Sequence, residues 1–229
     1  MEEQEMGAKF EQKYVTNVYD AIAPHFSHTR YKAWPFVEHF LKNQPKWSIV
    51  ADAGCGNGKY LGINPDLNMI GSDISESLIN ICKNRGFECM VSDCTNLPYR
   101  SNSFDVVISI AVVHHFSTVE RRIQSLKELL RITKPGGKVL AYVWAFEQVD
   151  KKGEQRYKEQ DVFVPWHLQK QYKKLNQEEL PPGLVFDRYY HMFKQGELEN
   201  LFKKCEEMNS IVETAFEKDN WIVVVDKKQ

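Results

Sequence analysis

Apolar residues recur at every fourth position over residues 9–23, which is the spacing of one face of an amphipathic helix. Pro24 predicts the end of this helix, because the residue before a proline is biased away from the helical conformation. Pro35 predicts the start of a second helix through Leu41, since the first helical position needs no N–H donor. Residues 9–45 are therefore expected to form a helical cap ahead of the main fold. The apolar residues of the first helix are Phe10, Tyr14, Val18 and Ile22.

From residue 47 onward, short runs rich in Val and Ile alternate with helix-like runs, which predicts a doubly wound α/β domain. A polar stretch at 147–180 interrupts this alternation and is interpreted as an excursion from a single domain spanning 1–229. A helix near 195–205 and two strand-like runs separated by Lys218 and Asp219 predict a final hairpin. The earlier strand-like runs are 47–53, 68–73, 87–93, 104–110 and 138–145, and the helix-like runs are 57–63, 76–85 and 119–133.

Composition bounds the class of protein without identifying its partner. The 229 residues are 42% hydrophobic and carry a net charge of −1, which is typical of one globular domain and excludes a strongly basic nucleic-acid binder. The five cysteines form no CxxC pair, so reduced thiols are expected and no metal site is predicted. The N-terminus is polar, and no apolar run approaches the length of about 18 residues that spans a bilayer. These two features predict a cytosolic or nuclear location without a membrane anchor.

A glycine-rich segment, DAGCGNG at 52–58, follows the first strand-like run. Glycines at 54, 56 and 58 suit a sharp turn that a ligand approaches closely. The spacing G-x-G-x-G differs from the dinucleotide fingerprint G-x-G-x-x-G, and three residues rather than four separate Gly54 from Gly58, unlike a Walker A loop. Both phosphate-binding interpretations therefore fit poorly.

Further markers stand at later strand ends. Asp73, 15 residues after Gly58, suits the hydroxyls of a ribose, and Asp93 suits an adenine amino group. Together with SFDVVISIAVVHHF and KPGGKVL, they predict the class I S-adenosylmethionine-dependent methyltransferase fold, a mostly parallel seven-stranded sheet with a C-terminal antiparallel hairpin. The predicted cofactor-binding residues are Tyr19, Arg30, Asp52, Gly54, Gly56, Asn57, Gly58, Asp73, Ile74, Asp93, Cys94 and Ala111.

Several segments reach beyond these general motifs, including VYDAIAPHFSHTRYKAWP (18–35), ISIAVVHHF (108–116) with ERR (120–122), QDVFVPWHL (160–168) and RYYHMFKQGELE (188–199). With these segments the chain resembles the eukaryotic tRNA wobble-uridine methyltransferases that esterify 5-carboxymethyluridine, and the methyltransferase domain of the eighth AlkB homologue. The resemblance covers nearly the whole chain, although 149–159 is shorter than in the longer relatives. It implies methyl transfer to the carboxylate of a modified uridine in the tRNA anticodon, and a small zinc-binding activator subunit.

Carboxylate methylation sets particular demands on the site. A carboxyl group with a pKa near 4 is ionised at neutral pH and needs no general base. Positioning and water exclusion therefore matter more than acid–base catalysis. We expect Arg30, Lys32, His114 and His115 to orient the substrate, with one histidine at the site and the other packed. Arg30 could alternatively bind the cofactor's carboxylate or form a surface salt bridge.

Aromatic and basic residues supply candidates for substrate and RNA contacts. The predicted substrate-binding residues are Trp144, Glu147, Tyr189, Tyr190 and His191, although Trp144 and the tyrosines could equally be packing residues. Basic residues in and after the excursion could hold RNA phosphates or simply form a solvated loop. They are Lys151, Lys152, Arg156, Lys158, Lys170, Lys173 and Lys174.

The third strand, residues 87–91, is expected at an edge of the sheet, where its apolar backbone offers the activator subunit a place to bind. Two alternative functions stay open at this point. One is methylation of a small carboxylic acid, which the cofactor motifs do not exclude. The other is a binding module that has lost catalysis. An NAD-dependent dehydrogenase is disfavoured by the glycine spacing.

Overall fold

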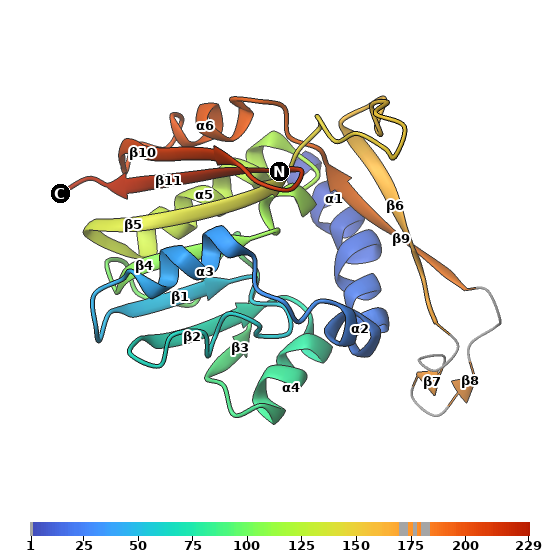
Figure 1. The fold of residues 1–229 in the computed structure, drawn as a ribbon, viewed down its shortest axis with the longest axis horizontal. Helices are drawn as coiled ribbons and strands as arrows, with labels where there is room; N and C mark the ends of the chain where they lie inside the picture. Colours follow the sequence, from blue (N-terminus) through green and yellow to red (C-terminus); the bar gives the residue numbers. More distant parts are fainter. Residues whose placement is uncertain (1, 170–173, 176–177, 180–183) are drawn as a thin grey trace.

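The computed structural model describes residues 2–169, 174–175, 178–179 and 184–229. Its main sheet contains β1 (Ile49–Ala53), β2 (Asn68–Asp73), β3 (Cys89–Val91), β4 (Phe104–Ile110), β5 (Thr133–Trp144), β10 (Met208–Phe216) and β11 (Asn220–Lys227). The seven strands lie in the order β10-β11-β5-β4-β1-β2-β3 (Figure 1). Strands β1 to β5 run parallel, whereas β11 pairs antiparallel with both β5 and β10. The predicted mostly parallel sheet and its C-terminal hairpin are confirmed.

Helices cover both faces of this sheet because successive strand residues point to opposite sides. On one face, Val106 and Ile108 of β4 pack with α3 (Pro35–Lys42). On the other face, Val107 packs with α5 (Val119–Ile132) and α6 (Glu197–Phe202). Helix α4 (Glu76–Asn84) packs through Ile79 and Cys82 against the segment that follows β1.

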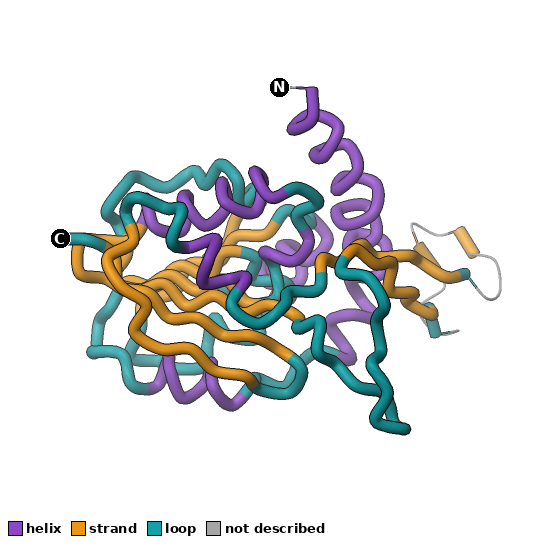
Figure 2. The backbone as a smooth tube through the Cα atoms, turned by 90° about the horizontal axis from the view of Figure 1, so that it is seen from above, coloured by secondary structure: helices purple, strands orange, loops and turns teal. Residues whose placement is uncertain are grey.

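The N-terminal helical segment continues beyond the proline at which it was expected to end. It comprises α1 (Glu2–Glu11), a π-helical turn η1 (Gln12–Thr16) and α2 (Asn17–Thr29), with Pro24 inside α2. Residues on both sides of Pro24, such as Ile22 and His25, are buried. Their packing offsets the backbone hydrogen bond that proline cannot make. Figure 2 shows this helical segment running from the body of the domain to the N-terminus.

Residues 57–63 do not form the predicted helix but a series of tight turns. The N–H of Leu61 donates to the Gly58 carbonyl at 3.1 Å, and that of Ile63 donates to Tyr60 at 3.1 Å. Gly54, Gly56 and Gly58 all have positive φ angles, which a right-handed helix does not allow. The glycines that favour a ligand-binding turn therefore also prevent a helix.

The excursion contains a separate antiparallel ribbon, in which β6 (Asp161–His167) pairs with β9 (Val185–His191). The ribbon lies beside the N-terminal helices and away from the main sheet (Figure 1). Trp166 of β6 packs with Val18 and Ile22 of α2. A short pairing of β7 (Lys174–Leu175) with β8 (Glu178–Glu179) completes the described part of the excursion. No helix in the described ranges is long and apolar enough to cross a membrane.

Two acidic residues, Glu11 and Asp20, fix the N-terminal helices to the sheet domain. Glu11, at the end of α1, forms an ion pair with Arg121 of α5 at 2.7 Å, and both side chains are nearly buried. Its Oε1 also accepts hydrogen bonds from the N–H and the hydroxyl of Ser117 at 2.7 and 2.9 Å. On α2, Asp20 accepts from the Ser75 hydroxyl at 2.6 Å, next to the start of α4. We call residues 2–29, held in this way, the roof.

Replacing Glu11 with Gln should therefore loosen the roof. The change leaves the Arg121 guanidinium buried without its carboxylate, and we expect a loss of about 2 kcal/mol or more in the free energy of unfolding. Chemical denaturation measures this loss. Glu5→Gln is the matched control on the same helix, because the Glu5–Lys9 pair is solvent-exposed and should contribute less than about 1 kcal/mol. Equal effects of the two substitutions would contradict the role of Glu11.

Candidate active site

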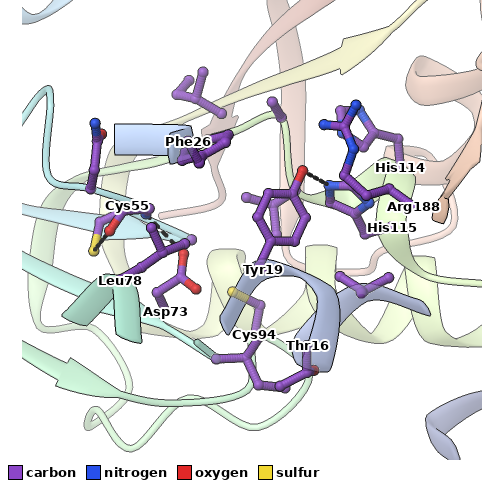
Figure 3. A pocket seen from close by; sticks show the side chains of 18 of the residues that line it. Thr16, Tyr19, Phe26, Cys55, Asp73, Leu78, Cys94, His114, His115 and Arg188 are labelled. Carbon is purple, nitrogen blue, oxygen red and sulfur yellow. Dashed lines mark hydrogen bonds between the residues drawn. The ribbon is translucent and has the colours of Figure 1, made fainter. Parts of the chain in front are cut away.

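A cavity that opens to solvent at its mouth lies at the carboxyl ends of the parallel strands. The segments after β1, β2, β3, β4 and β5 line it from below, and η1 and α2 of the roof line it from above. Figure 3 shows Asp73 and Cys94 toward one end of the cavity and His114 and Arg188 toward the other, with Tyr19 between them. The position agrees with the rule that ligands of doubly wound sheets bind beyond the carboxyl ends of the strands.

The turn after β1 forms part of the cavity floor. Gly54 has a φ of +88°, and a Cβ at this position would lie only 2.1 Å from Cγ2 of Val112. The N–H groups of Gly54 and Cys55 both donate to the Ser72 carbonyl of β2, at 2.7 and 2.9 Å. Glycine is therefore required at 54, because any side chain would separate the turn after β1 from the segment after β4.

Asp73 ends β2 and is held by backbone donors on both sides. Its Oδ2 accepts from the Gly56 N–H at 2.8 Å, and its Oδ1 accepts from the Ser75 N–H at 2.9 Å. Burial raises the pKa of this carboxyl, and the two N–H bonds act in the opposite direction. Each carboxylate oxygen keeps a further lone pair. The fixed carboxylate can therefore accept hydrogen bonds from two neighbouring hydroxyls, such as those of a ribose.

Asp52 carries a buried carboxylate without a protein partner. Neither of its oxygens has a hydrogen-bond partner among the described residues, and the residue is 1% exposed. Burial, with a smaller contribution from the Asp73 charge, raises its pKa to about 7, and Lys59 opposes the shift. Burial also lowers the pKa of Lys59 to about 8. An unsatisfied carboxylate beside the glycine turn suits a cationic group, so this end of the cavity fits the ammonium, ribose and adenine parts of S-adenosylmethionine.

The opposite end contains a hydrogen-bond chain whose direction can be assigned. His115 Nδ1 lies 2.9 Å from the Tyr189 carbonyl, which can only accept, so Nδ1 carries the proton. Burial lowers the pKa of His115 to about 3, so the ring is neutral and its Nε2 accepts from the Tyr19 hydroxyl at 3.1 Å. Tyr19 then accepts from Tyr190 at 3.1 Å, and Arg188 Nη1 donates to Tyr190 at 2.8 Å. Each group in the chain therefore donates to the next, in the order Arg188, Tyr190, Tyr19, His115 and the Tyr189 carbonyl.

His114 is also a neutral side chain, and a hydrogen bond to the backbone holds its ring in place. Its Nδ1 accepts from the Trp144 N–H at 3.0 Å, which fixes the ring against β5. Burial, followed by the nearby His115 and Arg188, holds the pKa of His114 well below its usual value. Trp144 in turn stacks on Tyr190, with ring centroids 4.4 Å apart. Both histidines thus contribute neutral, fixed walls instead of groups that exchange protons near neutral pH.

Most of the predicted residues meet in this one cavity. Asp93 lies at its edge, where its Oδ1 accepts from the Thr95 N–H at 2.8 Å and Arg121 approaches its Oδ2 to 3.7 Å. Ala111, after β4, has a φ of +64°, a conformation that residues other than glycine rarely adopt. The lining residues that the sequence predicted are Tyr19, Arg30, Gly54, Gly56, Asn57, Asp73, Ile74, Asp93, Cys94, Ala111, His114, His115, Trp144 and Tyr190.

Other predicted residues lie outside the cavity lining. Lys32 is solvent-exposed, and Glu147 instead accepts hydrogen bonds from the Gln195 N–H and the Trp221 indole. His191 is held between Asp161 and Glu197 at 2.9 and 2.7 Å.

Tyr189 contributes its backbone carbonyl to the hydrogen bond with His115, while its hydroxyl donates to the Asp161 carboxylate. Asp52 and Gly58 support the glycine turn from beneath: Gly58 packs on Cys82 and Phe87.

Sequence reasoning missed several lining residues, above all Arg188 on β9, and also Glu11, Lys59 and Arg121. Arg188 follows Asp187 and precedes Tyr189 and Tyr190 in β9, so the available signal was an arginine beside two aromatic residues in a strand. Glu11 and Arg121 are far apart in the sequence, and no local pattern links them. In the described part of the chain, no group of three or more His, Cys, Asp or Glu side chains is arranged to hold a metal ion.

Comparisons with known structures agree with this geometry. The methyltransferase domain family model matches residues 51–141. A S-adenosylmethionine-bound amino pentose methyltransferase from Micromonospora echinaspora aligns with a TM-score of 0.60 and 15% identity, over 90% of this chain and 97% of that one. A complex between the Haloferax volcanii Trm112 methyltransferase activator and a putative methyltransferase aligns with a TM-score of 0.65 and 15% identity, over 94% and 98%. These likenesses establish the S-adenosylmethionine-dependent methyltransferase fold.

Two curated relatives narrow the family. The tRNA (carboxymethyluridine(34)-5-O)-methyltransferase of Schizosaccharomyces pombe is 46% identical over 97% of this chain and 100% of its own length. The alkbh8 enzyme of Xenopus tropicalis, with the same activity in its name, is 42% identical over 97% of this chain, which spans 42% of that longer protein. The relatives thus confirm the resemblance seen in the sequence: this chain belongs to the tRNA (carboxymethyluridine(34)-5-O)-methyltransferase family.

Proposed function

We propose that this chain transfers a methyl group from S-adenosylmethionine to the carboxylate of 5-carboxymethyluridine at the wobble position of tRNA, forming the methyl ester. The observation that carries the proposal is the division of one cavity into two ends. One end fits the cofactor, and the other is lined by aromatic rings, a guanidinium and two neutral histidines. The names of the full-length relatives support this substrate.

The chemistry matches a site without a titrating base. S-adenosylmethionine supplies, when bound, a methyl group on a positively charged sulfur. An oxygen lone pair of the substrate carboxylate forms the new O–C bond, the electrons of the broken C–S bond stay on sulfur, and no proton moves. Opposite charges cancel during this step, so a cavity that excludes water favours it. His114 and His115, both neutral, hold the aromatic walls in place without competing for a proton.

The cofactor end offers a distinct partner for each part of S-adenosylmethionine. Asp73 would accept the ribose hydroxyls, because its two oxygens are already fixed by backbone N–H groups. Asp52 lies beneath the cavity lining, so its buried carboxylate, which lacks a hydrogen-bond partner among the described residues, would favour the cofactor's ammonium group through its charge and not by direct contact. Asp93, at the cavity edge, would accept from the adenine amino group. The strained Ala111 backbone, in the segment after β4, shapes another part of the cavity wall.

RNA contact would come from the exposed surface around the cavity mouth. Lys151, Lys152, Arg156 and Lys158 are all solvent-exposed in the turn before β6, and they would bind phosphates. Trp144, already stacked on Tyr190, would offer its second face to the uracil base. The predicted contacts at Lys170 and Lys173 lie outside the described residues, and the side chain of Lys174 is not described.

We also infer a small zinc-binding activator subunit as partner, docked at β3. This strand is at the end of the sheet order and exposes Met90 and Val91, which are 37% and 49% exposed. Unpaired edge strands with apolar side chains invite strand addition. The structural likeness to a methyltransferase solved with an activator supports this inference.

The first test is a methyl-transfer assay on tRNA that carries 5-carboxymethyluridine, with and without the activator. We expect ester formation at the wobble position. At saturating cofactor the rate should change less than about threefold between about pH 6 and pH 8, because neither histidine titrates there. Quantifying the ester by mass spectrometry of digested tRNA gives the result. Activity on free carboxylic acids alone would contradict the tRNA substrate, and a steep rate change near pH 7 would contradict a base-free step.

A second test concerns Asp52. Its folded pKa of about 7 lies above the ordinary 3.8, so its contribution to stability is full at low pH and is lost as the pH rises through about 7. Asp52→Asn should therefore raise the free energy of unfolding of the cofactor-free chain by about 2 kcal/mol near pH 8 and flatten its pH dependence. The same substitution should weaken S-adenosylmethionine binding at least about tenfold, as measured by calorimetry.

Asp66→Asn is the control for this substitution, because Asp66 pairs with Lys46 at the surface. It should change neither stability nor cofactor affinity appreciably. An Asp52→Asn chain that is less stable than the parent at pH 8 would overturn the assignment of a costly buried charge.

The third test addresses the partner. Val91→Lys should block activator binding, because a charge on an edge strand opposes strand addition. The same substitution should keep the chain soluble when it is expressed without the activator. Val212→Lys on β10, at the opposite edge, is a matched control, since Val212 is 51% exposed. Co-purification of the two proteins and the soluble yield of the chain alone are the measurements. Unimpaired binding by the Val91 variant would place the activator elsewhere.

A further inference from the structure

Arg188 is a buried cation facing a cavity. It lies in the middle of β9, is 5% exposed and lines the end of the cavity that holds His114 and Tyr190. Figure 3 shows its side chain beside His114 and His115, at the end away from Asp73. A charge that is removed from water in this way is normally paired.

The partners of Arg188 leave its charge uncompensated. Nη1 donates to the Tyr190 hydroxyl at 2.8 Å, whereas Nε is buried without a hydrogen-bond partner among the described residues. The guanidinium lies over the Trp166 ring at 4.7 Å from its centroid. No carboxylate within the described ranges comes within 4.0 Å of it, in contrast to Arg121 with Glu11 and Arg131 with Glu128. The surroundings therefore orient the guanidinium but do not neutralise it.

The other charged groups of the cavity do not fill this role. Glu11 is paired with Arg121, and Asp73 is held by Gly56 and Ser75 at the cofactor end. The two histidines beside Arg188 are neutral, partly because its charge lowers their pKa values. Arg30, at the exposed end of α2, lies over the same Trp166 ring at 5.3 Å. This end of the cavity is thus positively charged and attracts an anion.

We infer that Arg188 binds the carboxylate of the modified uridine and thereby distinguishes the acid substrate from its ester product. The inference rests on the proposed function. A guanidinium offers a planar set of N–H donors that matches a carboxylate, and Tyr190 occupies only one position of this set. Esterification removes the negative charge and one acceptor oxygen. The ion pair is then lost, so the product binds more weakly than the substrate and leaves the site.

The directed hydrogen-bond chain positions Arg188 for this task. Because Tyr19 donates to His115, it accepts from Tyr190, and Tyr190 is left to accept from Arg188. Tyr190 therefore anchors Nη1 with its lone pair and does not compete for the carboxylate as a donor. Tyr19 belongs to the roof, so this positioning depends on α2 as well as on β9.

The test compares RNAs that differ only in charge at the reactive group. Anticodon stem-loops carrying carboxymethyluridine, the neutral carbamoylmethyluridine or the methyl ester are bound to the chain, with its activator where the complex forms, in the presence of S-adenosylhomocysteine. We expect the parent protein to bind the acid at least about 30-fold more tightly than the amide or ester. Arg188→Gln should bind all three equally, and Arg188→Lys should restore part of the preference.

Kinetics and folding controls separate recognition from a structural role. Arg188→Gln should raise the KM for carboxymethylated RNA much more than it lowers kcat, while its affinity for S-adenosylhomocysteine stays within about threefold of the parent. Arg100→Gln, an exposed arginine after β3, controls for the loss of one positive charge and should keep the acid preference.

The outcomes distinguish this inference from the proposed function. A parent protein that does not methylate carboxymethylated tRNA overturns the proposed function. A parent that methylates it but binds acid, amide and ester equally overturns the role of Arg188, even if no variant folds. Retention of the acid preference by a folded Arg188→Gln variant overturns it as well.

Discussion

The ion pair between Glu11 and Arg121 is the contact on which the functional geometry depends. It joins the end of α1 to α5, and thereby holds η1 and α2 over the carboxyl ends of the strands. It adds to the contacts of α2 itself, such as the hydrogen bond from the Ser75 hydroxyl to Asp20, which keep Tyr19 within reach of His115 and complete the upper wall of the cavity. Low-dielectric surroundings strengthen charge interactions, so the buried groups that line this cavity interact more strongly than they would in water. The buried Glu11–Arg121 pair thereby helps to shape the electrostatics of the cavity that it borders.

The arrangement of charge in the cavity follows from this enclosure. Asp52 lies unpaired beneath the cofactor end, and Arg188 lies unpaired at the opposite end. Each destabilises the free protein, and each suits an oppositely charged part of a bound molecule. Between them the histidines remain neutral because burial and Arg188 lower their pKa values. Arg188, the cation that attracts an anion, thus also helps to keep His114 and His115 neutral and weakly basic. A reaction without proton transfer does not need either histidine as a base.

Local patterns in the sequence were sufficient to predict the site residues that lie directly after the strands of the parallel sheet. The glycines at 54–58 and Asp73 each follow a Val- and Ile-rich or otherwise apolar strand, and parallel strands bring such ends together. Residues 57–63 do not form the predicted helix because Gly58, near the start of this stretch, adopts a positive φ. Pro24 did not end α2, because tertiary packing of its neighbours outweighed a local preference.

Long-range contacts explain what the sequence could not predict. Glu147 was predicted from its position after the fifth strand, and His191 from its place beside two tyrosines expected to return over the site. Hydrogen bonds to Trp221 and Glu197 turn these two side chains away from the cavity. Arg188 and Glu11 could not be assigned from local patterns, because the contacts that place them join separate elements of the fold. Arg188 lies over Trp166 on the neighbouring strand β6, and Glu11 binds Arg121, which is 110 residues away in the sequence. The roles of such residues depend on their burial, so they can be recognised only once the fold shows which side chains are buried.

The roof and the anion site are linked through the shared hydrogen-bond chain. Tyr19 comes from the roof, Tyr190 and Arg188 come from β9, and His115 comes from the segment after β4. The proton directions hold only while all four groups are in contact, so the orientation of Arg188 depends on side chains from three separate segments. The upper wall of the cavity and its anion site are therefore built from the same contacts, and a change that displaces Tyr19 also removes the lone-pair acceptor that directs Tyr190 toward Arg188.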